Sequence, residues 1–283
     1  MLRCTGTSTE GISRGVSSTI LTMVGTPLER LEATLGTYPS VIVAFSGGVD
    51  SSVVAAAAQR VKGHKAMAVT LRGPSTPTRD LAMAREVVKV IGIRHLEVPI
   101  DQLTDERYAE NPSNRCYFCR SMEGEKLTLL AKQMGAEAIV DGVHKDDLMT
   151  DRPGLKAMAE WKFRHPLVEA GLNKEEVRSI ARELGLPNSE VPSNSCLASR
   201  IAHGESISHD VLDRVDAAED YISSLGFQQV RVRVKGGEAR VQVSRTEVPQ
   251  LMVPHLWESV KGRLLLLGFR SVVPDPEGYR PGT

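Results

Sequence analysis

The residues with the most specific chemistry form a short glycine-rich turn, SGGVDS at positions 46–51, directly after the apolar run at 41–45. Its two glycines let backbone N–H groups close on an anion, and a helix that begins near Ser51 adds its positive end. The hydroxyls of Ser46, Ser51 and Ser52 can donate hydrogen bonds to the same anion. Asp50 is a lone carboxylate among these donors, and it suits a Mg²⁺ ion that bridges a polyphosphate.

This turn resembles the PP-loop of the ATP pyrophosphatase superfamily, whose members activate a substrate oxygen by adenylation and release pyrophosphate. It is not a Walker A loop: the chain contains no G-x-x-x-x-G-K-[ST], and the turn lacks the lysine that reaches the terminal phosphates in kinases and GTPases. The alternative is an ordinary Gly-Gly turn between a strand and a helix. We favour the PP-loop and expect ATP and Mg²⁺ as ligands.

Three cysteines form the second group of reactive residues. Cys116 and Cys119 stand at C-x-x-C spacing in a polar segment that we expect to be a loop, and Cys196 lies in a second long loop. Both loops can meet over the ATP site, and three thiolates can hold a [4Fe–4S] cluster that keeps one free iron. The alternatives are a redox pair with Cys196 as a separate sulfur-handling nucleophile, a Zn²⁺ site, and unrelated thiols.

The zinc alternative makes a further demand on the chain. Zinc would need a fourth ligand, for which His203 is the nearest candidate, although a lone histidine is more often a surface residue. Structural disulfides are not expected in a cytosolic chain. Cys4 lies in the leader, and we expect it to be inert.

Two further polar groups follow expected strands. Asp141 and Gly142 end the strand at 137–141, where a glycine permits close approach of an adenylate and acidic residues can face magnesium. A solvated acidic turn is the alternative there. Arg231 and Arg233 alternate on one strand and therefore share a face, with Arg240 on the partner strand.

These guanidiniums could clamp carboxylates or a phosphate in a bidentate manner. The alternative for them is an exposed, solvated face. Glu219, in the helix expected before this strand, could pair with one of the arginines or help to hold a metal.

Composition narrows the class of protein. The chain has 283 residues, 41% of them hydrophobic, and its 35 basic and 35 acidic residues cancel, which disfavours a large nucleic acid as partner. No apolar run approaches the roughly 18 residues of a membrane-spanning helix, and the first 26 residues lack the hydrophobic block of a secretory signal. We therefore expect a cytoplasmic protein with a flexible N-terminal extension, with a transit peptide as the alternative.

Apolar periodicity predicts alternating strands and helices. Capping boxes at Thr26 and Asn173 mark two helix starts. Strands are expected at 41–45, 65–71, 95–100 and 137–141, and helices at 27–37, 51–61, 121–134, 173–185, 210–225 and from Arg79. This alternation predicts an α/β fold whose parallel sheet has helices on both faces and ligands at the carboxyl ends of its strands.

The architecture changes after the long loop at 187–209, because residues 230–243 alternate as a β-hairpin around Gly236-Gly237. We therefore expect three parts. They are a flexible extension at 1–26, a PP-loop domain at 27–205, and a small α+β substrate or oligomerisation domain at 206–283.

Together these residues resemble the LarE family, the ATP-dependent sulfur transferases of nickel-pincer nucleotide synthesis. The likeness covers about residues 27–270 and includes 44–52, 141–142, 151–156, 199–200 and 217–233. It implies an adenine nucleotide alpha hydrolase-like domain with a small C-terminal domain, assembled as a homo-oligomer, often a hexamer. It also implies a pathway with an upstream carboxylase/hydrolase, a downstream nickel-insertion enzyme and lactate racemase as an acceptor of the cofactor.

The implied reaction starts from pyridinium-3,5-biscarboxylic acid mononucleotide, a small-molecule nucleotide. Each carboxylate is adenylated by MgATP with loss of pyrophosphate, and sulfur then displaces AMP to give a thiocarboxylate. Some members sacrifice a cysteine sulfur, whereas others carry a three-cysteine [4Fe–4S] cluster whose free iron binds the sulfide. Cys116, Cys119 and Cys196 resemble the second type, although Arg115 stands where a sacrificial-type member carries a tryptophan.

The resemblance also implies two sets of binding residues. Those for ATP and Mg²⁺ are Ala44, Ser46, Gly47, Gly48, Asp50, Ser51, Ser52 and Gly142. Those for the substrate are Ser199, Arg200, Glu219, Arg231 and Arg233.

Three other functions compete with this interpretation. A tRNA 2-thiolation enzyme of the PP-loop class would want a basic RNA-binding module, which a chain of zero net charge does not offer. An amidotransferase-like synthetase would need ammonia from elsewhere, since no glutaminase domain is present. A non-enzymatic iron–sulfur scaffold would leave the SGGVDS turn without a purpose.

Overall fold

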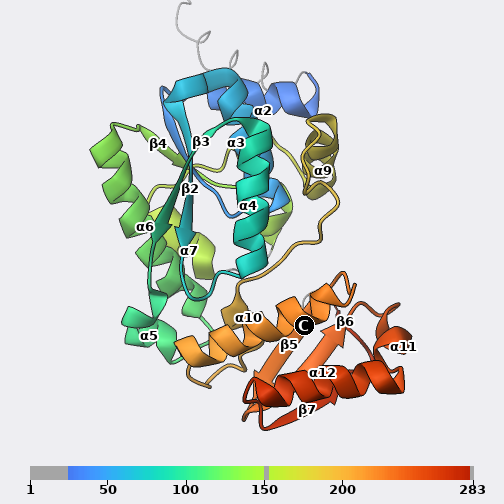
Figure 1. The fold of residues 1–283 in the computed structure, drawn as a ribbon. Helices are drawn as coiled ribbons and strands as arrows, with labels where there is room; N and C mark the ends of the chain where they lie inside the picture. Colours follow the sequence, from blue (N-terminus) through green and yellow to red (C-terminus); the bar gives the residue numbers. More distant parts are fainter. Residues whose placement is uncertain (1–24, 150–152, 281–283) are drawn as a thin grey trace, which may run out of the picture.

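The first layer of the fold is a four-stranded parallel sheet, seen in a computed structural model that describes residues 25–149 and 153–280 (Figure 1). Its strands are β1 (Val41–Ala44), β2 (Ala66–Arg72), β3 (Arg94–Pro99) and β4 (Ala138–Val140), in the order β3-β2-β1-β4. The chain runs outward from β1 through β2 and β3 and then returns to the other side of β1. Sheets of this kind bind ligands at the carboxyl ends of the strands where the order reverses, which here are the ends of β1 and β4.

Helices cover both faces of this sheet because its strands alternate their apolar side chains between two cores. One core joins Val41 and Val43 to α2 (Pro27–Gly36), α3 (Val49–Lys62), α4 (Thr78–Ile91) and α9 (Lys174–Glu183). The opposite core joins Ile42 to α6 (Arg115–Met134) and α7 (Pro153–Glu160). Capping boxes at Thr26 and Asn173 start α2 and α9, as their sequences predict.

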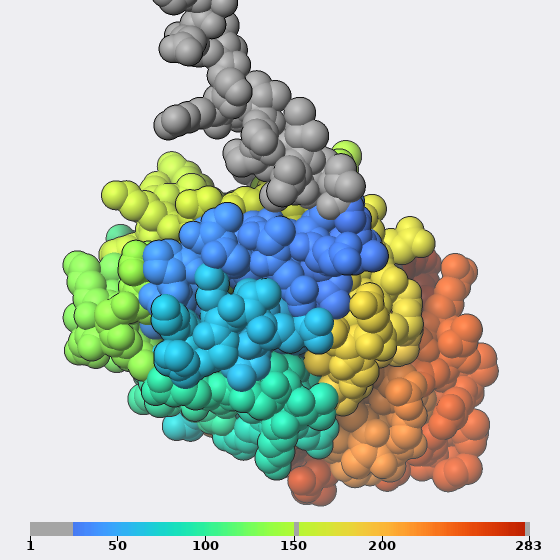
Figure 2. Space-filling model, turned by 90° about the horizontal axis from the view of Figure 1, so that it is seen from above, coloured from blue at the N-terminus to red at the C-terminus, as the bar shows by residue number. Residues whose placement is uncertain are grey.

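A second sheet follows, with strands β5 (Val230–Lys235), β6 (Glu238–Val243) and β7 (Ser271–Pro274) in the order β5-β6-β7. The β5–β6 hairpin is antiparallel and β7 pairs in parallel with β6. Residues of α10 (His209–Ser224) and α12 (Pro254–Leu266) share its core, which also takes in Tyr108 and Leu197 from the earlier part of the chain. Figure 2 shows this C-terminal part, in orange and red, along one edge of the molecule.

Shorter elements complete the described chain. They are α5 (Glu106–Ala109), α8 (Pro166–Glu169), α11 (Val248–Leu251) and the 3-10 turns η1 (Gly63–Lys65), η2 (Gln102–Thr104), η3 (Lys145–Met149) and η4 (Leu197–Arg200). In Figure 2, α2 in blue lies beside yellow residues of α9, a contact that joins distant parts of the sequence. Among the described helices, none is long and apolar enough to cross a membrane.

The predicted fold class is confirmed, but one local expectation is wrong. Cys116 and Cys119 do not lie in a loop: α6 begins at Arg115, six residues before the expected start. C-x-x-C spacing is also the i, i+3 spacing of neighbours on a helix, so the segment is compatible with either state. Cys4, most of the N-terminal extension, and Asp151 and Arg152 lie outside the described residues.

Candidate active site

The SGGVDS turn joins β1 to α3 and is held by hydrogen bonds within itself. The Gly48 N–H donates to Ser46 Oγ over 3.3 Å, and the hydroxyls of Ser51 and Ser52 donate to the Gly48 carbonyl over 3.0 and 2.8 Å. Gly47 has φ +80°, and a Cβ there would lie 2.8 Å from the Cβ of Ala84 in α4. The turn therefore requires glycine at this position and is fixed before any ligand arrives.

Asn188 supports the turn from outside, and Ser52 belongs to this support. The Asn188 side-chain amide donates to the Gly47 carbonyl at 2.7 Å and to Ser52 Oγ at 2.8 Å. Ser52 is fully buried, and its hydroxyl proton is already given to Gly48. In this conformation the Ser52 hydroxyl supports the turn, and its donation to an anion stays a prediction. The role of Asn188 could not be predicted from its neighbours in the sequence, because it lies in the loop after α9, far from the SGGVDS turn along the chain.

Gly142, just after β4, lies directly against the turn. A Cβ on Gly142 would lie 2.6 Å from the backbone nitrogen of Ser51. Next to it, Asp141 is buried, and its Oδ1 accepts from the Val143 N–H and lies 2.8 Å from His165 Nδ1. Burial lowers the pKa of His165, but the hydrogen bond and charge of Asp141 raise it more. The Oδ2 atom of Asp141 is buried without a hydrogen-bond partner.

Asp50 already forms an ion pair with a lysine side chain of the protein. Lys174 Nζ lies 2.5 Å from its Oδ1 and 2.6 Å from its Oδ2, and both side chains are about a quarter exposed, at 27% and 26%. Lys174 stands 124 residues further along the chain, at the start of α9. Its distance in the sequence is why motif analysis of the turn could not find it.

The three cysteines are free and influence one another electrostatically. Burial and then the charge of Glu123 raise the pKa of the Cys119 thiol, which donates to Glu123 Oε1 at 3.5 Å. Desolvation by the surrounding protein also raises the pKa of the Cys196 thiol. The charge of Cys116 raises this pKa further, whereas the charge of Arg115 lowers it.

The cysteines are not arranged as a metal-ion site in this structure. Within residues 25–149 and 153–280, no group of three or more His, Cys, Asp or Glu side chains has the geometry to hold a metal ion. His203 Nδ1 lies 2.9 Å from the Arg115 guanidinium, so this histidine faces a cation and not the thiols. Its candidacy as a zinc ligand therefore finds no support.

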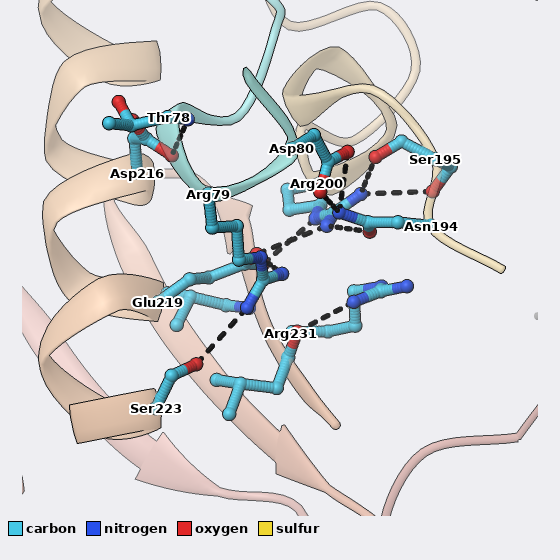
Figure 3. A network of polar contacts seen from close by, with 12 residues as sticks. Thr78, Arg79, Asp80, Asn194, Ser195, Arg200, Asp216, Glu219, Ser223 and Arg231 are labelled. Carbon is cyan, nitrogen blue, oxygen red and sulfur yellow. Dashed lines mark hydrogen bonds and ion pairs between the residues drawn. The ribbon is translucent and has the colours of Figure 1, made fainter. Parts of the chain in front are cut away.

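A buried ion network underlies the Cys196 loop (Figure 3). Glu219, in α10, and Arg200, in η4, are each 1% exposed at their side chains and pair over 2.8 Å. Glu219 Oε2 also pairs with Arg79 of α4 at 2.8 Å, and Oε1 accepts from the Val232 N–H of β5. Both carboxylate oxygens are therefore used inside the protein. Glu219 pairs with two arginines in this structure, and a contact between Glu219 and the substrate stays a prediction.

Arg200 uses its remaining donors to shape the cysteine loop. Its Nη1 donates to the carbonyls of Ser195 and Cys196, at 2.7 and 3.1 Å, and to Ser199 Oγ at 2.9 Å. Its Nη2 donates to Asn194 Oδ1 at 3.0 Å. Because Arg200 is buried with every nitrogen engaged, it positions the loop and has no donor left for a substrate.

Arg231 makes no ion pair with any described residue. It is 5% exposed, donates to the Val230 carbonyl at 2.8 Å and to the Ser193 carbonyl at 3.4 Å, and lies over the ring of Tyr279. Burial, and then the charge of Arg200, lower the pKa of Arg231 to about 10. A buried cation held in this way is prepared for an anionic ligand.

The other predicted substrate residues flank Arg231 in different ways. Arg233 is half-buried and donates to Gln242 Oε1 at 2.9 Å, while Ser199 Oγ donates to the Cys196 carbonyl at 2.8 Å. Arg240 is exposed and pairs with Glu238, so it does not join the buried arginines.

Helix α4 connects the two halves of the site. Its first turn makes three contacts (Figure 3). The Thr78 hydroxyl donates to Asp216 of α10, and Arg79 forms an ion pair with Glu219. Asp80 accepts a hydrogen bond from Asn194 of the Cys196 loop. The same helix contacts the SGGVDS turn at Ala84. The nucleotide turn and the cysteine loop are therefore braced by one rigid element.

This architecture defines an ATP-using enzyme of the PP-loop class. In agreement, residues 34–111 match the family model described as asparagine synthase. The chain is 38% identical to an uncharacterized Synechocystis protein over 260 residues, which cover 92% of this chain and 97% of the relative. It is 34% identical to the pyridinium-3,5-bisthiocarboxylic acid mononucleotide synthase of Lactiplantibacillus plantarum, over 92% of this chain and 94% of the synthase. The chain belongs to the LarE family of ATP-dependent sulfurtransferases.

A partial likeness reaches a second group of PP-loop enzymes. The tRNA-specific 2-thiouridylase MnmA of Azorhizobium caulinodans is 31% identical over 203 residues, but these cover 56% of this chain and 51% of the thiouridylase. The likeness to the synthase therefore accounts for far more of the chain.

We predict that Gly142→Ala weakens ATP binding without unfolding the protein. The added Cβ would lie 2.6 Å from the Ser51 nitrogen, so the SGGVDS turn must shift. We expect the Kd for ATP, measured by calorimetry, to rise at least about tenfold, which corresponds to about 1.4 kcal/mol. The control is Gly36→Ala, where a Cβ meets nothing within 4 Å. Equal affinities for the two variants would contradict a nucleotide role for this contact.

Glu219→Gln should destabilise the fold severely. The substitution leaves Arg79 and Arg200 without their shared carboxylate, and an uncompensated buried charge costs about 3–5 kcal/mol. Urea unfolding should report this loss. The control is Glu190→Gln, which removes an exposed pair with Arg182 and should cost no more than about 1 kcal/mol. Similar losses in both variants would mean that the network does not hold the fold.

Proposed function

We propose that this protein adenylates the carboxylates of pyridinium-3,5-biscarboxylic acid mononucleotide with MgATP and replaces them with thiocarboxylates in nickel-pincer nucleotide biosynthesis. The likeness to the Lactiplantibacillus plantarum synthase, over 92% of the chain, supports this substrate. The structural observation that carries the proposal is Arg231, a buried cation without a carboxylate partner among the described residues. A mononucleotide with several anionic groups supplies the charge that such a site lacks.

In the proposed first step, a substrate carboxylate oxygen attacks the α-phosphorus of ATP, and pyrophosphate leaves. The backbone N–H groups of the SGGVDS turn and the N-terminus of α3 stabilise the charge on the departing pyrophosphate. Asp50 and the unpartnered Oδ2 of Asp141 would hold Mg²⁺, whose preferred ligands are oxygen atoms. Arg231 and Arg233 would orient the substrate so that its carboxylate faces the nucleotide.

In the proposed second step, sulfur attacks the acyl carbon, and AMP leaves. Three free thiols offer the donor chemistry of a [4Fe–4S] cluster, bound through Cys116, Cys119 and Cys196. Such a cluster would supply a sulfide for transfer.

The remaining features of the proposal come from the family. We assign residues 206–283 to substrate and oligomer contacts and propose a homo-oligomer, with a hexamer as the expected form. A carboxylase/hydrolase would supply the dicarboxylated nucleotide, and a nickel-insertion enzyme would consume the product for lactate racemase. The expected compartment is the cytoplasm.

The test is an anaerobic assay of the full chain, reconstituted with iron and sulfide, together with MgATP and the dicarboxylated pyridinium mononucleotide. We expect pyrophosphate release that depends on the mononucleotide, and replacement of oxygen by sulfur in its mass, more than once per protein. One event per protein with loss of sulfur from Cys196 would indicate the sacrificial version. No turnover here, but thiolation of tRNA, would favour the function of the thiouridylase relatives.

Cysteine variants separate the two sulfur sources. If a cluster delivers the sulfur, each of Cys116→Ser, Cys119→Ser and Cys196→Ser should lose both the iron–sulfur absorbance and the transfer. Loss of transfer in Cys196→Ser alone, with the metal centre intact in the other two variants, would overturn the cluster source.

Arg231→Gln should weaken binding of the mononucleotide and leave ATP binding unchanged. Since the variant removes a desolvated cation, we expect a rise in substrate Kd of roughly 10- to 100-fold. Thermal stability should not fall, because the wild-type side chain lacks an ion pair with any described residue. Arg240→Gln, on the neighbouring strand, is the exposed control. A normal substrate Kd for Arg231→Gln would remove Arg231 from the site.

A further inference from the structure

The SGGVDS turn has no lysine of its own, yet a lysine lies on it. Within residues 25–149 and 153–280, Lys174 is the one basic side chain that forms an ion pair with this turn, through both oxygens of Asp50 at 2.5 and 2.6 Å. Its ammonium group therefore sits beside the carboxylate that suits Mg²⁺ and at the N-terminal end of α3, where phosphate groups would be held.

The backbone at Lys174 is anchored, whereas its side chain is not buried. The Lys174 N–H donates to Asp146 Oδ2 at 2.9 Å, and the capping box of Asn173 and Glu176 fixes the start of α9. Only the long side chain, 27% exposed, links this anchor to Asp50. Four rotatable bonds let the ammonium group change partners while the helix stays in place.

We propose that Lys174 binds the β- and γ-phosphates of ATP and that Asp50 holds it in readiness before the nucleotide arrives. On binding of MgATP, the Lys174–Asp50 pair separates: the ammonium group moves to phosphate oxygens, and the freed carboxylate takes the Mg²⁺. The exchange replaces one ion pair by two, and it creates no unpaired charge. This role rests on the proposed function only in that ATP is the ligand.

A purely structural role fits the pair less well. An ion pair that is a quarter exposed on both sides stabilises a fold by no more than about 1 kcal/mol. An ammonium group bound to both oxygens of Asp50 repels a Mg²⁺ ion that approaches the same carboxylate. If Lys174 merely neutralised Asp50, Lys174 would compete with Mg²⁺ for this carboxylate. Removal of the lysine would then tighten the binding of MgATP.

The experiment measures the Kd of the full-length protein for ATP and for AMP, with Mg²⁺, by calorimetry. For Lys174→Met we expect the Kd for ATP to rise roughly 10- to 100-fold, as for loss of a charge-assisted contact, whereas the Kd for AMP changes less than about twofold. Lys174→Arg should recover part of the ATP affinity because it keeps the charge. Lys89→Met, an exposed residue of α4, is the control for the same chemical change.

The sign of the result decides the role. Unchanged or tighter ATP binding by Lys174→Met would overturn the proposal, and so would an equal loss of ATP and AMP affinity. Circular dichroism melting of the variant would identify an unfolded protein, and in that case Lys174→Arg carries the comparison. Failure of the wild type to bind ATP would instead refute the proposed function.

Discussion

The structure of the site depends on a buried ion pair between Glu219 and Arg200. Removing two charges from water costs desolvation free energy. This cost is offset only if the charges are in close contact and every remaining donor and acceptor is hydrogen-bonded, so the pair must keep nearly ideal geometry. The pair therefore fixes three things together: helix α10, strand β5 and the loop that carries Cys196. Arg79 extends this constraint to α4 and so to the parallel sheet.

One consequence is that the nucleotide turn and the cysteine loop cannot move independently. Gly47 packs on Ala84 of α4, while the first turn of α4 binds Asn194 and Glu219. In the proposed mechanism, an acyl-adenylate formed at the nucleotide turn would have to meet sulfur from the cysteine loop before water attacks it. Bracing through α4 would hold the two sites at a fixed separation for this transfer.

The parts of the molecule that could be predicted from the sequence are those encoded locally. The apolar alternation of Val41, Ile42 and Val43 and the capping box at Thr26 each depend on residues a few positions apart. Residues that act across the fold were missed for the opposite reason. Asn188 and Lys174 reach the SGGVDS turn only after α9 has packed on α3.

Glu219 shows a different limit of sequence reasoning. The sequence indicated that this carboxylate could pair with an arginine, but could not reveal that Arg200 and Arg79 engage both of its oxygens. Ser52 is similar, since a hydroxyl in a phosphate-binding turn can serve the backbone instead of the ligand. Burial is the property that separates these roles, and it depends on the whole fold.

The second core has a consequence for how the chain can be divided. Tyr108, Leu197, Ala198 and Ile201 lie within it, although they precede the residues that form its sheet. A fragment that begins at Ser206 would therefore leave part of this apolar core open to water, and the N-terminal fragment would carry the matching apolar side chains on its surface. An exchange of the C-terminal part between relatives must therefore carry the residues at 108 and 197–201 with it.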